Sequence, residues 1–183
     1  MRFELTQRFA APAAAVAAAY ADPGLYPTLV GLPKLGGIEV LDHRTTETEA
    51  RLRVRFRFTG DLPAAVTAVI DPARLTWVQE TTHDLATGAT TFRLVPDHYP
   101  DRLRSSGRFT VTPSGADGSR RVVAGELKVH ALLVAGRVES AIVSGLEEYL
   151  MAEAPAVDRY LAGPSDSSDS SDSSGSTGSP GAY

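Results

Sequence analysis

Residues 51–58 alternate strictly between arginine and apolar side chains, reading Arg-Leu-Arg-Val-Arg-Phe-Arg-Phe. Successive side chains of a β-strand point to opposite faces, so a strand places all four arginines on one face and the four apolar residues on the other. A helix would scatter the arginines around its circumference. The segment therefore predicts a sheet with one solvated face and one dry face that another element must cover.

The composition is that of an ordinary globular domain, because 43% of the 183 residues are hydrophobic and 22% are charged. The formal net charge is −4, but Asp166, Asp169 and Asp172 lie in a C-terminal segment rich in Ser, Asp and Gly. Residues 1–162 thus carry 18 basic and 19 acidic groups, a net charge of −1. This balance argues against nucleic acid as a partner. We expect one domain over residues 1–162 and a disordered tail over 163–183.

The chain has no cysteine, which excludes disulfides, thiol nucleophiles and thiolate metal sites. No apolar run approaches the ~20 residues needed to span a bilayer, so we expect no integral membrane insertion. Residues 9–21 have the outline of a signal peptide, but Glu4 in the would-be basic region and Pro12 in the apolar stretch oppose that interpretation. We therefore expect a cytoplasmic protein, and a protein partner stays unknown.

Periodicity and turn residues divide the chain into strands and helices. Strands are predicted at 2–9, 36–44, 49–59, 64–70, 74–83, 89–96, 103–112 and 120–130. Helices are predicted at 12–20, in a short segment ending at Val30, and over 135–161, where apolar residues recur at threes and fours. Pro155 lies inside the last pattern and predicts a kink or break near 151–154 with a weaker final segment. The fold class is α+β.

This order of elements resembles that of the START-like (SRPBCC, helix-grip) superfamily over residues 1–162. Four stretches carry the resemblance: Phe9–Pro12 with Tyr20, Asp22, Pro23 and Tyr26; Phe58–Pro63; Leu75–Trp77; and Pro96–Asp101 with Gly145 and Leu146. The last three are most similar to an actinobacterial family of uncharacterised function. The resemblance implies a curved antiparallel sheet and two short helices wrapped on a long C-terminal helix, with a ligand cavity between sheet and helix. One departure is the connection Arg44–Thr48, where some relatives carry a glycine-rich loop.

Inward-facing positions of the predicted strands and helix are apolar, with a few neutral polar groups. Such a lining suits an uncharged, mostly apolar molecule such as a lipid or polyketide, although the same spacing also fits a filled core. A buried amide needs a partner, a ligand or water, and Gln7 and Gln79 are candidates for such a group. The predicted ligand-binding residues are Gln7, Phe56, Phe58, Trp77, Gln79, Phe92, Phe109, Leu127, Ile142 and Tyr149.

The loop Asp97–Asp101 is the best polar cluster, because it holds an imidazole and a phenol between two prolines. His98 and Tyr99 could move a proton in a cyclase-like reaction, or the loop could be a turn with structural roles alone. His83 and His98 are separated by about 25 Å of strand, so no metal site is expected. No nucleotide-binding motif occurs, and no cofactor is expected.

Three functions follow from these patterns. The leading hypothesis is a binding protein for a small apolar molecule, more a carrier or sensor than a catalyst. The second is a polyketide aromatase/cyclase-like enzyme that uses His98 or Tyr99. The third is a protein-interaction module that uses the arginine face, although carboxylates at Glu39, Glu47, Glu49 and Glu80 could neutralise that face from neighbouring strands.

Overall fold

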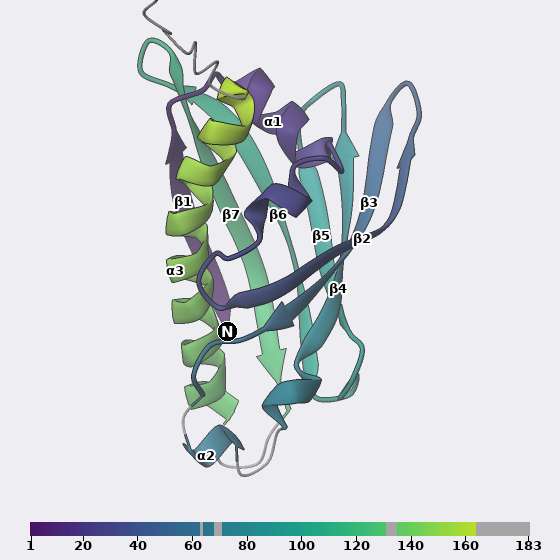
Figure 1. The fold of residues 1–183 in the computed structure, drawn as a ribbon, viewed down its shortest axis with the longest axis vertical. Coiled ribbons are helices and arrows are strands. Elements are labelled where there is room, and N and C mark those ends of the chain that lie inside the picture. Colours follow the sequence, from purple (N-terminus) through teal and green to yellow (C-terminus); the bar gives the residue numbers. More distant parts are fainter. Residues whose placement is uncertain (63, 68–70, 131–134, 164–183) are drawn as a thin grey trace, which may run out of the picture.

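The computed structural model describes residues 1–62, 64–67, 71–130 and 135–163, and these form an α+β helix grip. A curved sheet lies against one long helix, α3, with the shorter helices at its ends (Figure 1). The strands are β1 (Arg2–Phe9), β2 (Leu35–Thr45), β3 (Glu49–Phe58), β4 (Thr76–Asp84), β5 (Thr90–Pro96), β6 (Leu103–Ser114) and β7 (Gly118–Val129). The helices are α1 (Ala13–Ala21), η1 (Tyr26–Leu29), α2 (Ala64–Thr67), η2 (Pro72–Arg74) and α3 (Ala135–Ala162). The predicted tail lies outside the described residues from residue 164 onward.

The seven described strands are all antiparallel and lie in the order β1-β7-β6-β5-β4-β3-β2. Every neighbouring pair except β1 and β7 is consecutive in the chain, so β2 to β7 form a meander whose last strand takes up β1. In β3 the apolar side chains of Leu52, Val54 and Phe56 are at most 4% exposed, whereas the arginines between them face outward. The predicted two-faced strand is confirmed.

The outer face of β3 is neutralised by carboxylates from its neighbours. Arg53 Nε lies 3.2 Å from Glu80 Oε1, and Arg55 contacts Glu39 at 3.2 Å. Arg51 pairs with Glu49 in the same strand. The cross-strand partners Glu39 and Glu80 are as predicted, whereas Glu49 pairs within β3 and Glu47 forms no ion pair among the described residues. These pairs reduce the positive excess on which an interaction module at this face would depend.

The strand predicted at 64–70 is wrong where the structure describes it, because Ala64–Thr67 form the short helix α2. Strand β3 pairs directly with β4, with Arg57 opposite Thr76, so the sheet has no place for a strand between them. Alanine also favours helix, and the Thr67 hydroxyl donates to the Ala64 carbonyl at 3.1 Å. The remaining positions, 68–70, lie outside the described residues.

Helix α3 runs through Pro155 without a break, contrary to the predicted interruption. The final segment is held by tertiary contacts that offset the hydrogen bond lost at proline. Val157 is fully buried, and the Asp158 carboxylate accepts hydrogen bonds from the backbone of Ala10 and Ala11. The last turns are thus anchored to the β1–α1 connection and are not a weaker appendage.

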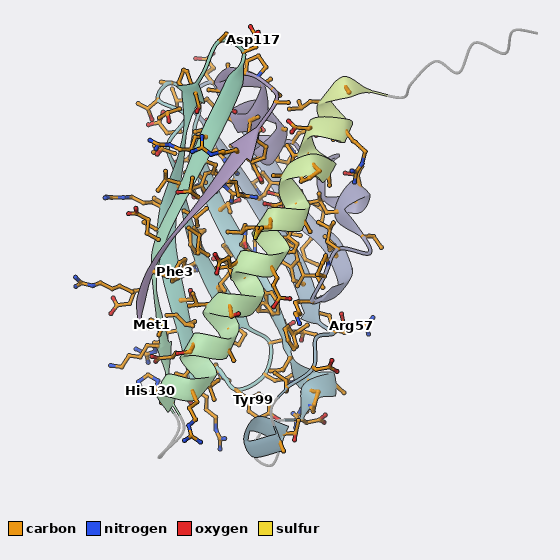
Figure 2. The ribbon with its side chains drawn as sticks, turned by 90° about the vertical axis from the view of Figure 1, so that its left-hand side faces the viewer. Met1, Phe3, Arg57, Tyr99, Asp117 and His130 are labelled. Atoms are coloured by element: carbon orange, nitrogen blue, oxygen red, sulfur yellow. The ribbon has the colours of Figure 1, made fainter. Side chains whose placement is uncertain are left out.

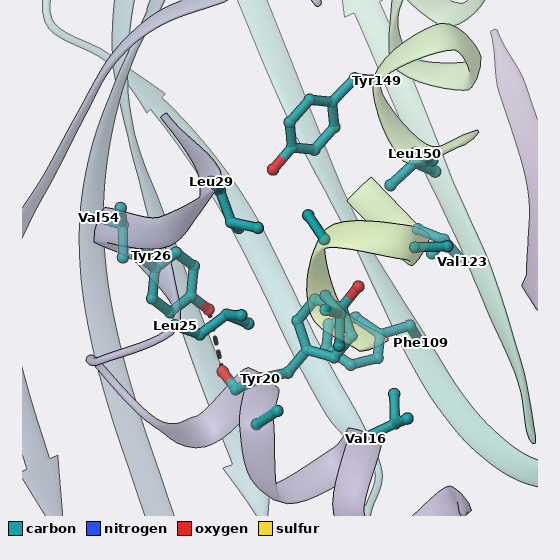
Figure 3. Packing of buried hydrophobic residues seen from close by; sticks show 14 of the residues in the cluster. Val16, Tyr20, Leu25, Tyr26, Leu29, Val54, Phe109, Val123, Tyr149 and Leu150 are labelled. Carbon is teal, nitrogen blue, oxygen red and sulfur yellow. Dashed lines mark hydrogen bonds between the residues drawn. The ribbon is translucent and has the colours of Figure 1, made fainter. Parts of the chain in front are cut away.

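The packed core lies at the end of the sheet where α1 and η1 meet the last turns of α3. Val16, Leu25 and Leu29 are completely buried there. Figure 3 shows Tyr26 reaching from η1 so that its hydroxyl donates to the Tyr20 carbonyl, at 3.0 Å. Toward the other end of the space between sheet and helix, the described residues form a smaller hydrophobic cluster, of Val129 and Val138 with Leu62 and Leu103. Among the helices of the described residues, none is long and apolar enough to cross a membrane.

Candidate functional site

A cavity of about 460 Å³ lies between the concave face of the sheet and α3. Its strand wall comes mainly from β3 to β7, with Phe3 of β1 and Leu35 of β2. Helix α3 covers it from Val138 to Glu153. Phe56 and Trp77 stack at 5.8 Å between ring centroids on the strand wall. Side chains of the sheet and α3 project into the space between them in Figure 2. The structure therefore combines a filled core at one end with a hollow at the other.

Nine of the ten predicted ligand-binding residues line this cavity: Phe56, Phe58, Trp77, Gln79, Phe92, Phe109, Leu127, Ile142 and Tyr149. The exception is Gln7, whose side-chain amide is hydrogen-bonded to other groups of the protein. Gln7 Nε2 donates to the Leu150 carbonyl at 2.7 Å and to Glu153 at 3.0 Å, while its Oε1 accepts from Arg121 at 2.9 Å. The need for a partner was real, but the protein itself supplies it.

Both residues of the enzyme hypothesis, His98 and Tyr99, also line the cavity, and both are half-buried. His83 lies elsewhere in the sheet, directly opposite Thr90. The two histidines thus stay apart, as the strand geometry predicts, and the described residues contain no group of side chains suited to a metal ion.

The closed end of the cavity contains a buried ion pair that the sequence analysis missed. Arg121 and Glu153 are 6% and 5% exposed, and Arg121 Nη1 lies 2.9 Å from Glu153 Oε2. Tyr20 and Tyr149 donate their hydroxyls to the two oxygens of the same carboxylate, at 2.8 and 2.9 Å. With Gln7, this network joins β1, α1, β7 and α3. It also makes one end of an otherwise apolar cavity polar.

Burial raises the pKa of Tyr20 and of Tyr149 well above the ordinary value of 10.0. Both phenols therefore stay protonated and act as donors to Glu153. Arg121 Nε is buried without a hydrogen-bond partner among the described residues. The guanidinium carbon lies 3.9 Å from the ring centroids of Tyr20 and Phe109, so aromatic faces supply part of the missing stabilisation.

Two sequence signals could have identified this pair. Strand alternation places Arg121 on the same face as Val123 and Leu127, which is the dry face. Glu153 follows Tyr149 by one helical turn, so it shares the cavity face of α3. The charge of each residue suggested a solvent-exposed position, but a charged side chain can stay buried when it is paired with an opposite charge and hydrogen-bonded.

His83 is a buried histidine whose pKa burial lowers from the ordinary value of 6.5 to about 4, with a smaller contribution from Arg121. The ring is 3% exposed and lies between the hydroxyls of Thr90 and Thr81, at 2.9 and 3.2 Å. Below pH 6.5, His83 is protonated in the unfolded chain, whereas in the folded chain it becomes protonated only near pH 4. Folding stability must therefore fall as the pH falls through this window.

We expect the lowered pKa of His83 to reduce the free energy of unfolding by about 3 kcal/mol as the pH falls from 6.5 to 4. Urea denaturation of the protein and of His83→Gln at pH 7 and pH 4.5 measures this, because the variant lacks the titration. The wild type should lose more stability than the variant by most of that amount. Equal losses in the two proteins would mean that His83 does not titrate in this way.

A second hollow, of about 560 Å³, lies on the outer face over β2 to β5. Its wall includes Arg53 and Arg93, which both pair with Glu80 at 3.2 and 2.6 Å. This surface is charged, and its charges are satisfied within the sheet. The cavity under α3 is the stronger candidate, because its wall is mostly apolar, as is typical of sites for small molecules.

Comparison with known proteins identifies the fold. The family model described as "Protein of unknown function (DUF2505)" matches residues 4–161. A sequence search of curated proteins gave no match. The Zhui aromatase/cyclase from Streptomyces sp. R1128 is 17% identical over 89% of this chain and 98% of its own, with a TM-score of 0.63. A truncated norcoclaurine synthase from Thalictrum flavum is 18% identical over 90% and 94%, with a TM-score of 0.60.

A START superfamily protein from Mycobacterium smegmatis is 19% identical over 88% of this chain and 97% of its own, with a TM-score of 0.54. Identities this low show a shared fold and no more. The fold is the START-like helix grip, and the resemblance drawn from the order of elements is confirmed.

Proposed function

The chain belongs to the DUF2505 family, and from its cavity we infer that it binds a small, mostly apolar molecule between the sheet and α3. The observation that carries this proposal is the wall of the cavity. Aromatic and aliphatic side chains dominate it, and neutral polar groups such as Gln79 and Ser105 lie among them. A volume of about 460 Å³ falls within the range of ordinary ligand sites.

A cavity wall that is mostly apolar is unfavourable in contact with water, which supports an apolar ligand as its occupant. A bound apolar molecule makes dispersion contacts with this wall and removes its own surface from water. We propose that the protein acts by sheltering such a molecule, as a carrier or sensor, and that the nine lining residues named above contact it.

Native mass spectrometry of the purified protein tests this proposal, with and without added decanol as an apolar probe. We expect a one-to-one complex with decanol or with a molecule retained from the host. Trp77 provides a second readout, because it is the single tryptophan of the chain and lines the cavity. Its fluorescence should change on titration with decanol. A protein that stays empty and shows no change in Trp77 emission would refute a binding role.

An enzyme of the aromatase/cyclase kind is the second candidate, favoured by the position of His98 and Tyr99 on the cavity wall. In that case one of the two side chains moves a proton on a bound, folded chain. His98→Phe and Tyr99→Phe should then abolish turnover of a polyketide-type substrate while decanol binding persists. Retained turnover in both variants would eliminate these residues as proton carriers.

A further inference from the structure

The two ends of the cavity differ in how their charges are satisfied. At the closed end, Arg121 is matched by Glu153. At the opposite end, Arg74 and Arg102 are exposed and yet line the cavity, so this end opens to solvent. We call Arg74, His98, Tyr99 and Arg102 the mouth cluster. Figure 2 shows Tyr99 at this end of the molecule, beside α2.

The two arginines of the mouth cluster converge on one aromatic ring. Their guanidinium carbons lie 5.6 and 5.8 Å from the ring centroid of Tyr99, Arg74 coming from η2 and Arg102 from the loop before β6. Within the described part of the chain, neither forms an ion pair with a carboxylate. The other cationic side chains of the wall do, since Lys34 pairs with Glu148 at 3.3 Å. Among the described residues, the mouth thus holds two arginines that form no ion pair, although Asp61 also lines the cavity.

The backbone of Tyr99 is held in an unusual conformation to place this ring. Its φ is +60°, a left-handed value that is uncommon outside glycine and that persists only where the surroundings impose it. The loop is fixed by Asp97, whose carboxylate accepts from Arg55 at 3.1 Å and whose amide donates to the Thr76 carbonyl at 3.0 Å. These contacts therefore hold the loop that carries Tyr99 in one conformation.

His98 adds another donor to the same cluster. Its Nδ1 lies 3.4 Å from Arg74 Nη2, and because a guanidinium only donates, Nδ1 must accept this weak hydrogen bond. The ring proton is then on Nε2, which supplies an N–H donor in addition to those of the two arginines. Two guanidinium groups and an imidazole N–H beside an apolar cavity are a set of donors suited to an anionic group.

We propose that the ligand is an amphipathic anion, with its apolar part in the cavity and a carboxylate or phosphate head at the mouth between Arg74 and Arg102. This inference rests on the proposed binding function and specifies its ligand class. At the closed end the donors of Gln7, Tyr20 and Tyr149 are already engaged within the protein. The charge of Arg121 is matched there by Glu153, and its remaining donor, Nε, belongs to a guanidinium held between the rings of Tyr20 and Phe109. The exposed arginines at the open end are therefore the better position for the head.

Titrations of Trp77 fluorescence with decanoate and with decanol, at pH 8 and low salt, test the proposal, because the two probes share a chain and differ in the head. We expect decanoate to bind about tenfold tighter, the factor for a charge-assisted hydrogen bond over a neutral one. In Arg74→Gln/Arg102→Gln this preference should fall to about one, with decanol affinity unchanged. Both substituted side chains are exposed, so folding should be preserved, which circular dichroism checks.

The matched control is Arg104→Gln/Arg108→Gln, which removes the same charge from exposed positions of β6 outside the cavity wall. This control should keep the preference for decanoate. Equal loss in both double variants would reduce the effect to net charge and overturn the mouth site. If decanol binds and decanoate binds no tighter, the anion proposal fails while the binding function stands. If neither probe binds, the binding function itself fails.

Discussion

Removing the Glu153 carboxylate should lower the free energy of unfolding by about 3–5 kcal/mol, the largest loss that we expect of one substitution in this protein. Glu153→Ala deprives four donors of their acceptor: Arg121, Gln7, Tyr20 and Tyr149. The Arg121 guanidinium would stay buried without a counter-charge, and breaking a buried pair on one side costs far more than the pair contributes. Urea denaturation at neutral pH measures the loss.

Glu148→Ala is the matched control, because Glu148 lies on the same helix and pairs with Lys34 near the surface, its side chain 54% exposed. That substitution should cost about 1 kcal/mol or less. Arg121→Met/Glu153→Leu should recover most of the loss, since apolar replacements satisfy each other where a single unpaired charge cannot. A loss for Glu153→Ala no greater than that for Glu148→Ala would contradict the network described for the closed end.

The fold was largely predictable because its signals are local. Alternation along β3 and the threefold and fourfold recurrence of apolar residues in α3 each report which face of one element is dry. Where the prediction failed, the deciding contacts came from elsewhere in the chain. Residues 64–67 read Ala-Ala-Val-Thr, a stretch too short to show a helical stripe, and the direct pairing of β3 with β4 leaves no place for a strand there. Pro155 stays in a helix because the turns beyond it are anchored to the β1–α1 connection.

The candidate site likewise has one part that local sequence patterns predict and another that depends on contacts between distant residues. The apolar wall could be predicted, since inward-facing positions of strands and helix converge on any grip of this kind. The buried pair of Arg121 and Glu153 could not be derived with equal ease, because its members are 32 residues apart and each alone resembles a surface charge. The mouth cluster likewise depends on η2, with Arg74, meeting the loop before β6, with Arg102, and no periodicity in the sequence predicts that contact.

Filling the cavity from α3 should abolish binding without unfolding the protein, and Gly145 is the position for it. It lines the cavity, and a Cβ placed there meets only Lys34 Cγ, at 3.9 Å. Glycine in a helix interior costs about 1 kcal/mol relative to alanine, so Gly145→Ala should be slightly more stable and bind decanol unchanged. The benzyl group of Gly145→Phe, by contrast, should occupy the space that the ligand needs, and decanol should no longer change Trp77 emission.

Gly136→Phe separates cavity filling from the general effect of an aromatic residue on this helix. Gly136 is exposed on α3 and is not part of the cavity wall, and a Cβ there meets no atom of the described residues within 4 Å. Its phenylalanine variant should bind decanol like the wild type, while Gly145→Phe binds none although both unfold at similar urea concentrations. Undiminished binding by Gly145→Phe would place the ligand outside the space between sheet and helix, because one volume cannot hold both the benzyl group and the probe.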